Sequence, residues 1–130
     1  MNLNRFAPYA AVVLRLAVGG VFLHHGWWKL HNFPAVTGMI HGIGVPFATV
    51  FAGYLTAVET LGAICVILGV LTRWWGLLMA ANMVVAILAV VLPSGQVPEL
   101  EGLLLAGSLA LVALGDGPLS IGVSLKKGSD

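Results

Sequence analysis

Four long apolar stretches dominate this 130-residue sequence and limit what it can fold into. They cover residues of about 8–30, 46–71, 73–92 and 98–115, and short polar or Pro/Gly-containing segments separate them. An α-helix needs about 20 mostly apolar residues to cross the hydrocarbon core of a membrane. No stretch alternates polar and apolar residues with the period of two that membrane strands require. The sequence therefore predicts an all-α protein, an integral membrane four-helix bundle formed by one domain over residues 1–130.

Charged residues are too scarce for a surface that faces water. They make up 8% of the chain, whereas soluble domains carry about 25%. A soluble fold of this composition would expose large apolar patches, so the expected partner of the surface is a lipid bilayer. The formal net charge is +1 and no basic stripe is present, which argues against a nucleic-acid partner. The first stretch carries Arg15 and no small-residue cleavage site, so we expect a retained helix rather than a signal peptide.

The Lys and Arg residues near the helix ends predict how the bundle is oriented. One side of the predicted bundle collects most of them: Arg5, Arg73, Lys126 and Lys127. The other side has only Lys29. Short cytoplasmic loops carry an excess of positive charge, so we expect both termini to be cytoplasmic. This pattern predicts a multi-pass protein of the cytoplasmic (inner) membrane.

Each predicted helix carries one polar residue deep inside its apolar stretch. These residues are Arg15, Glu59, Asn82 and Ser108. Counted at 1.5 Å per residue from the nearest boundary, they lie about 14 to 21 Å into their helices and form one layer. A lone charge there costs several kcal/mol, so we expect an Arg15–Glu59 ion pair completed by Asn82. The layer either binds a polar headgroup and moves protons, or only fixes helix register.

Glycines lie on the same helix faces as the two deep charges. Gly19 and Gly26 share a stripe with Arg15, while Gly62 and Gly69 cluster with Glu59. Small residues let membrane helices approach closely. The glycines therefore predict either tight packing around the charges or a slot for a flat molecule, and the sequence leaves both open.

A second polar group lies at the outer ends of the helices and is a candidate ligand entrance. Its members are His25, Trp27, Trp28, Lys29 and Glu101. The alternative is that the aromatic residues and His25 are ordinary interfacial residues and that Glu101 complements a helix N-terminus. The histidines have no Asp, Glu or Cys at ligand spacing, and none is deep enough for haem, so we expect neither metal nor haem. No catalytic motif is present, so we expect no catalytic residue in this chain.

Three segments carry a resemblance to a known family: Arg15…Gly19…Phe22…Gly26…Lys29, then Glu59-x-x-Gly62…Leu68-Gly69-x-x-Thr72-Arg73, then Leu114-Gly115-Asp116-Gly117-Pro118-Leu119-Ser120. Over nearly its whole length the chain resembles the DoxX family. The resemblance implies a four-helix bundle in the cytoplasmic membrane. The family's namesake is similar to a small subunit of a thiosulfate:quinone oxidoreductase, and its relatives are associated with quinone and catechol handling and thiol redox stress. The positions it singles out are Arg15, Lys29, Glu59 and Arg73.

These observations lead to one leading hypothesis and two alternatives. In the first, the protein is a membrane subunit that binds a quinone or similar apolar redox molecule and serves a partner oxidoreductase or redox-stress system. Arg15, Glu59 and Asn82 would contact the headgroup or move protons. The alternatives are a non-catalytic anchor or assembly factor for a neighbouring enzyme, and a small transporter. A homo-oligomer is compatible with each of them.

Overall fold

The computed structural model describes residues 2–129, and every regular element in them is helical. This confirms the predicted all-α class over the described residues. Most elements are α-helices, but η1 is a 3₁₀-helix and η2 and η3 are π-helical. In chain order the elements are η1 (Asn4–Tyr9), α1 (Ala10–His31), α2 (Phe33–Gly42), α3 (Ala48–Ala57), η2 (Val58–Gly62), α4 (Ala63–Leu68), α5 (Thr72–Ala86), η3 (Ile87–Val91), α6 (Glu99–Leu114) and α7 (Ile121–Ser129).

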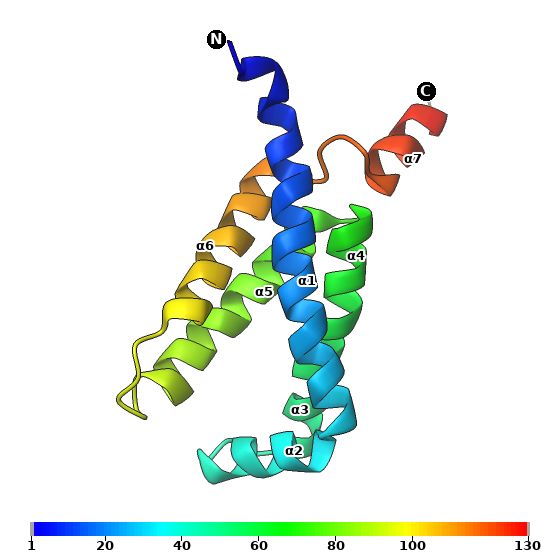
Figure 1. The fold of residues 1–130 in the computed structure, drawn as a ribbon. Coiled ribbons are helices and arrows are strands. Elements are labelled where there is room, and N and C mark those ends of the chain that lie inside the picture. The colour runs from blue at the N-terminus through cyan, green and yellow to red at the C-terminus, as the bar shows by residue number, and fades with distance from the viewer. Residues whose placement is uncertain (1, 130) are drawn as a thin grey trace.

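Within residues 2–129, three continuous helices are long and apolar enough to cross a membrane, judged by length and composition. They are Asn4–His31, Ala48–Leu68 and Thr72–Val91, with 28, 21 and 20 residues. They correspond to the first three predicted spans. The fourth predicted span corresponds to α6, which has 16 residues and is therefore about 24 Å long. α6 packs along α5, and the two chain ends lie at the same end of the molecule (Figure 1).

Two short helices lie outside the four predicted spans. α2 occupies most of the segment between the first two spans and lies crosswise at the end of α1 (Figure 1). It starts with a proline in its first turn, where the missing N–H costs nothing. Val36 and Ile40 of α2 pack against Ala52 of α3. α7 follows the last turn and carries Lys126 and Lys127 near its end. Both helices are shorter than a membrane span, so the span pattern did not reveal them.

The second and third spans are not regular α-helices throughout. Each contains a π-helical segment, Val58–Gly62 in the second and Ile87–Val91 in the third. A π-segment inserts an extra residue into a helical turn and is frequently found at functional sites. Glu59 lies inside the first of these segments. The extra residue rotates the following part of the helix, which changes the side chains that face the neighbouring helices.

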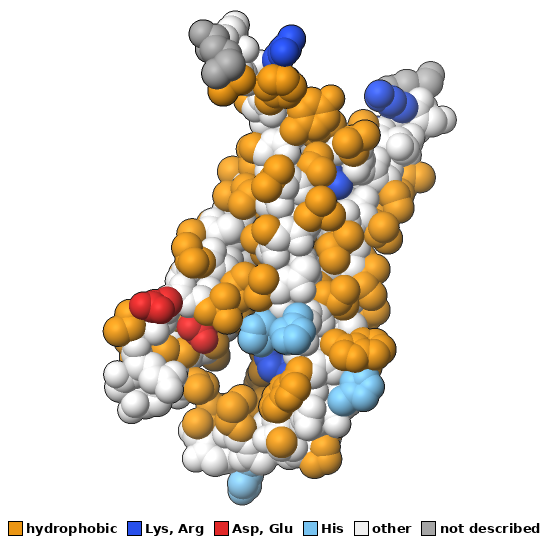
Figure 2. Space-filling model, viewed as in Figure 1, with side chains coloured by type: hydrophobic (Ala, Val, Ile, Leu, Met, Phe, Trp, Pro, Cys, Tyr) orange, Lys and Arg blue, Asp and Glu red, His pale blue; other side chains and the backbone are white. Residues whose placement is uncertain are grey.

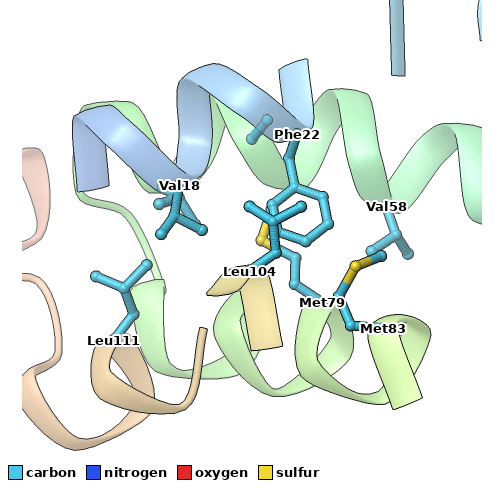
Figure 3. Close-up of a cluster of buried hydrophobic side chains, with 9 residues drawn as sticks. Val18, Phe22, Val58, Met79, Met83, Leu104 and Leu111 are labelled. Atoms are coloured by element: carbon cyan, nitrogen blue, oxygen red, sulfur yellow. The ribbon is translucent and has the colours of Figure 1, made fainter. Parts of the chain in front are cut away.

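The long helices meet around one apolar cluster. Figure 3 shows its main side chains, which come from α1, η2, α5 and α6: Val18, Phe22, Val58, Met79, Met83, Leu104 and Leu111. Phe22, Met79 and Leu111 are almost completely buried. Lipid tails are as apolar as these side chains, so close van der Waals packing rather than burial from water must hold membrane helices together.

Glycines make the close contacts between α1 and its neighbours. A Cβ added at Gly26 would lie 2.5 Å from Oγ1 and 2.8 Å from the backbone nitrogen of Thr60. At Gly19 the same atom would lie 2.7 Å from Cγ1 of Ile67. Between η2 and α5, a Cβ on Gly62 would lie 2.7 Å from Cε3 of Trp75. All four distances are too short for a real Cβ, so larger residues would push the helices apart.

Candidate functional site

The predicted ion pair between Arg15 and Glu59 is wrong. Arg15 is 2% exposed, and its guanidinium is bound by backbone carbonyls of the last interhelical turn. Nη1 donates to the carbonyl oxygens of Asp116 at 2.5 Å and Pro118 at 3.1 Å, and Nη2 donates to that of Leu119 at 2.9 Å.

The packing of α1 explains why the two charges do not meet. Gly26 of α1, and not Arg15, lies against the backbone of Glu59 and Thr60. Arg15 is 11 positions earlier in the sequence, about 16 Å along the helix. It therefore reaches the end of α4, where a Cβ on Gly69 would lie 3.0 Å from Nη1 of Arg15. Depths counted from predicted loop boundaries had placed the two residues level.

Asp116 joins three helices at this end of the molecule. Its Oδ1 accepts a hydrogen bond of 2.9 Å from the backbone N–H of Thr72, which satisfies one of the free amides at the start of α5. Its carbonyl binds Arg15 of α1, and it follows α6 directly. Gly115 and Gly117, with φ of 71° and 68°, give the turn its left-handed conformation. Asp116 therefore serves as a turn residue and as a cap for α5.

Glu59 pairs with Lys29 instead. The Nζ–Oε2 distance is 2.5 Å, and the side chains are 18% and 3% exposed for Lys29 and Glu59 respectively. Lys29 comes from the last turn of α1 and Glu59 from the π-segment η2. Removing two charges from water carries a desolvation penalty that two apolar side chains of similar volume do not carry. A buried ion pair of this kind is therefore weak support for stability and a candidate for function.

The Lys29–Glu59 pair lies on the wall of a cavity of about 170 Å³. Residues from both predicted polar groups line it: His25, Lys29, Glu59, Asn82 and Glu101. Figure 2 shows a hollow in this part of the surface, with acidic side chains on one side and basic and histidine side chains on the other. The structure thus brings together five of the nine residues that the sequence assigned to a ligand layer or its entrance.

Most of the cavity wall is apolar, and sequence reasoning missed much of it. α1, α3, α5 and α6 contribute Phe22, Leu55, Met83 and Leu104. Further wall residues come from α2 and from the π-segment of the third span: Met39, Ile40, Ala89 and Val90. The spacing of Val36, Met39, Ile40 and Ile43 is that of an amphipathic helix, and this was the signal that could have revealed α2 as a wall.

Asn82 presents an unused hydrogen-bond donor at the cavity. The residue is 5% exposed, and its Nδ2 has no hydrogen-bond partner within residues 2–129. Leaving a buried donor unsatisfied costs about 1–3 kcal/mol. A ligand with an acceptor oxygen at this position would remove that cost.

Four of the predicted ligand-site residues lie elsewhere. Arg15 is held by the turn after α6, and Ser108 packs at the crossing of α5 and α6, where a Cβ on Gly76 would be 3.0 Å from its carbonyl oxygen. Neither lines the cavity. Trp27 and Trp28 are 59% and 55% exposed on the outside of α1, and they do not line it either. The four residues of the predicted polar layer therefore lie in three places. Glu59 and Asn82 line the cavity, Arg15 binds the turn after α6, and Ser108 lies between α5 and α6.

Fold and site together define a small helical protein of the membrane type with a buried ion pair beside an apolar cavity. A sequence model of the family described as DoxX matches residues 10–92. The match covers more than half of the chain, and this protein belongs to the DoxX family.

Two relatives extend the comparison. A protein of Haemophilus influenzae named "Uncharacterized protein" is 35% identical over 86 residues, which cover 65% of this chain and 61% of the relative. The chain thus spans about three fifths of that relative's length. "Putative oxidoreductase CatD" of Bacillus subtilis is 29% identical over 128 residues, covering 97% of this chain and 94% of the relative. No solved structure matches.

Proposed function

We propose that this protein is a membrane subunit that binds a quinone, or a similar apolar redox molecule, in the cavity between α1, α2, α5 and α6. The observation that carries the proposal is the free Nδ2 of Asn82 beside the partly buried Lys29–Glu59 pair in a mostly apolar cavity. Ligand sites are typically apolar with a few convergent polar groups. A quinone matches that description, because its carbonyl oxygens accept hydrogen bonds and its ring and tail are apolar.

The residues of the cavity have separable roles in this proposal. Asn82 and Lys29 donate hydrogen bonds to the carbonyl oxygens, which fixes the orientation of the headgroup. Glu59 holds Lys29 in place and is a carboxylate on the cavity wall that would accept a proton from a hydroxyl of the reduced ligand, a quinol, as it is reoxidised. Phe22 and Leu104 offer apolar surface for the ring. A bound quinone would supply the electron transfer, since the protein's own side chains offer no electron carrier.

A partner oxidoreductase or redox-stress system completes the proposal. The relative named as an oxidoreductase aligns along almost the whole chain, and this supports a redox context. A subunit that holds only the quinone needs another protein to deliver or remove electrons.

We also propose that α6 is the fourth span and that both termini lie on the cytoplasmic side of the inner membrane. Arg5, Arg73, Lys126 and Lys127 support this orientation through the excess of positive charge found on cytoplasmic segments. α6 is shorter than the hydrocarbon core is thick, and local thinning of the bilayer accommodates short spans.

The function is tested by measuring the quinone that co-purifies with the protein in mild detergent. The Asn82→Leu variant removes the free donor from the cavity, and we expect its quinone content to fall about tenfold, the effect of losing one buried hydrogen bond. The matched control is Ser108→Ala, which removes another buried, unpartnered polar group that does not line the cavity. We expect the control to keep the wild-type content. Equal quinone content in both variants, or none in the wild type, would contradict the proposal.

The Lys29–Glu59 pair also favours a second candidate, a non-catalytic anchor for a neighbouring enzyme, because the two charges satisfy each other. The charge-swapped variant Lys29→Glu with Glu59→Lys distinguishes the anchor from the quinone-binding subunit. An anchor predicts that the swap restores both folding and the function of the neighbouring enzyme. Quinone binding predicts a folded protein with little quinone, because the carboxylate and the ammonium have exchanged positions in the cavity.

A further inference from the structure

A second pocket lies at the opposite end of the molecule from α2, where α5, α6 and α7 meet. Its volume is about 340 Å³, and it shares no lining residue with the first cavity. Its polar lining consists of Thr72, Arg73, Asp116 and Lys126. The quinone proposal makes no use of this pocket.

The charge in this pocket is predominantly positive and unpaired. Within residues 2–129 neither Arg73 nor Lys126 has a salt-bridge partner. The carboxylate of Asp116 is engaged by the backbone N–H of Thr72, and the guanidinium of Arg15 lies beside its backbone. Two free cations therefore outweigh one carboxylate that already has partners.

One residue that lines the pocket, Thr72, carries a buried hydroxyl without a partner within residues 2–129. Thr72 is 0% exposed, and its Oγ1 has no hydrogen-bond partner among the described residues. It is the first residue of α5, a helix of 15 residues, whose N-terminus carries a partial positive charge. Hydroxyl and cation donors that converge at a helix N-terminus are the features of a phosphate site.

The rim of the pocket is apolar on one side. Leu71 and Trp74 line it and are 59% and 67% exposed. In a membrane-type protein such side chains contact acyl chains, and Trp is enriched at the level of the lipid headgroups. The pocket therefore combines donors for an anion with a surface for lipid.

We propose that the pocket formed by Thr72, Arg73 and Lys126 binds a phosphate group. Arg73 and Lys126 neutralise it, and the hydroxyl of Thr72 donates a hydrogen bond to one of its oxygens. The group belongs either to an anionic phospholipid or to free phosphate. The proposal does not depend on quinone binding at the other cavity.

The test is native mass spectrometry of the full-length protein in detergent, with added phosphatidylglycerol or phosphatidylcholine. We expect one tightly bound phosphatidylglycerol per chain and weaker binding of phosphatidylcholine. Lys126→Gln and Arg73→Gln should each weaken phosphatidylglycerol binding about tenfold, the effect of losing one charge-assisted hydrogen bond. Thr72→Val should weaken it without changing the charge.

Lys127→Gln is the matched control, because Lys127 is adjacent in α7 and does not line the pocket. We expect its affinity to stay within about twofold of the wild type, because Lys127 is exposed and an exposed charge outside the pocket contributes little. If millimolar inorganic phosphate displaces the lipid, or stabilises lipid-free protein against heat in a Lys126-dependent way, free phosphate is the source. Equal binding by Lys126→Gln and Lys127→Gln, or equal binding of the two lipids, overturns the proposal. Lys126 is exposed, so this variant decides the question even if Arg73→Gln does not fold.

Discussion

Two buried cations of α1 are stabilised in different ways. Arg15 binds four backbone carbonyls, three in the turn after α6 and that of Ile67 in α4, with the planar, forked guanidinium that only arginine has. Lys29 binds one carboxylate at the edge of a cavity. The first arrangement holds the turn after α6 to the end of α4, and within the described residues only Nε of Arg15 has no partner. The second leaves donors of Lys29 free for a ligand at the cavity. We therefore assign Arg15 to stability and Lys29 to binding.

Replacing Arg15 tests the first assignment. Arg15→Met leaves the carbonyls of the turn without a donor, and we expect the free energy of unfolding to fall by about 3 kcal/mol, as when one partner of a buried charged contact is removed. Arg15→Lys should give a smaller loss, because an ammonium reaches fewer of the carbonyls. Unfolding in detergent followed by circular dichroism measures both. Arg5→Met, at an exposed position, is the control and should have no effect. Wild-type stability of Arg15→Met would contradict the assignment.

At the scale of elements, the sequence predicted the polar residues inside the spans and missed the π-segments and the short helix α2. Glu59 and Asn82 were recognised as site candidates because polar residues inside apolar stretches are costly. The π-segments Val58–Gly62 and Ile87–Val91 were not predicted, because one extra residue in a turn leaves no mark on composition or hydropathy. α2 was missed because ten residues are too few for a span.

The partner of Arg15 could not be deduced from the sequence for a geometric reason. Depth along a helix was counted from predicted boundaries, whereas the real register is set by the contact of Gly26 with Thr60. A shift of a few residues along α1 moves a side chain by several ångströms. Carbonyl acceptors in a distant turn also carry no signal in residue type, since every residue has one.

Alanine substitutions at two glycines of α1 test whether the contact of Gly26 with Thr60 sets the register of this helix. Gly26→Ala would place a Cβ 2.5 Å from Oγ1 of Thr60 and 2.8 Å from its backbone nitrogen, whereas nothing lies within 4 Å of the same atom at Gly20. We expect Gly26→Ala to lower the midpoint of thermal unfolding and the quinone content together, because α1 and Lys29 must move. Gly20→Ala should be neutral or slightly stabilising, since alanine favours helix by about 1 kcal/mol. Equal melting temperatures for the two variants would contradict this account of the packing.

At the scale of the whole molecule, the two pockets lie at opposite ends of one helical unit. The cavity that contains Glu59 is bordered by α2, and the pocket that contains Thr72 is bordered by α7. Both chain ends lie at the second end (Figure 1). In the proposed orientation, the cavity opens toward the outer surface of the membrane and the positive pocket meets the inner headgroups.

Cysteine labelling tests this orientation and the fourth span together. In a Cys65→Ser background, single cysteines at the exposed positions His41→Cys and Lys127→Cys are treated with a membrane-impermeant maleimide in intact cells. Three spans separate the two positions if α6 crosses the membrane, so only the cysteine at position 41 should react before lysis. Labelling of both from the same side would mean that α6 does not cross, and the reverse pattern would invert the orientation.

The central claim, that the cavity beside Asn82 holds a quinone, is tested most directly by photo-crosslinking in native membranes. A quinone that carries a diazirine is activated, and the labelled peptides are identified by mass spectrometry. The account predicts label on Met39 of α2, on Ile43 just after α2 and on the segment 82–90, with competition by unlabelled quinone. Label confined to exposed positions away from the cavity such as Leu103, or label that excess quinone does not reduce, would contradict it.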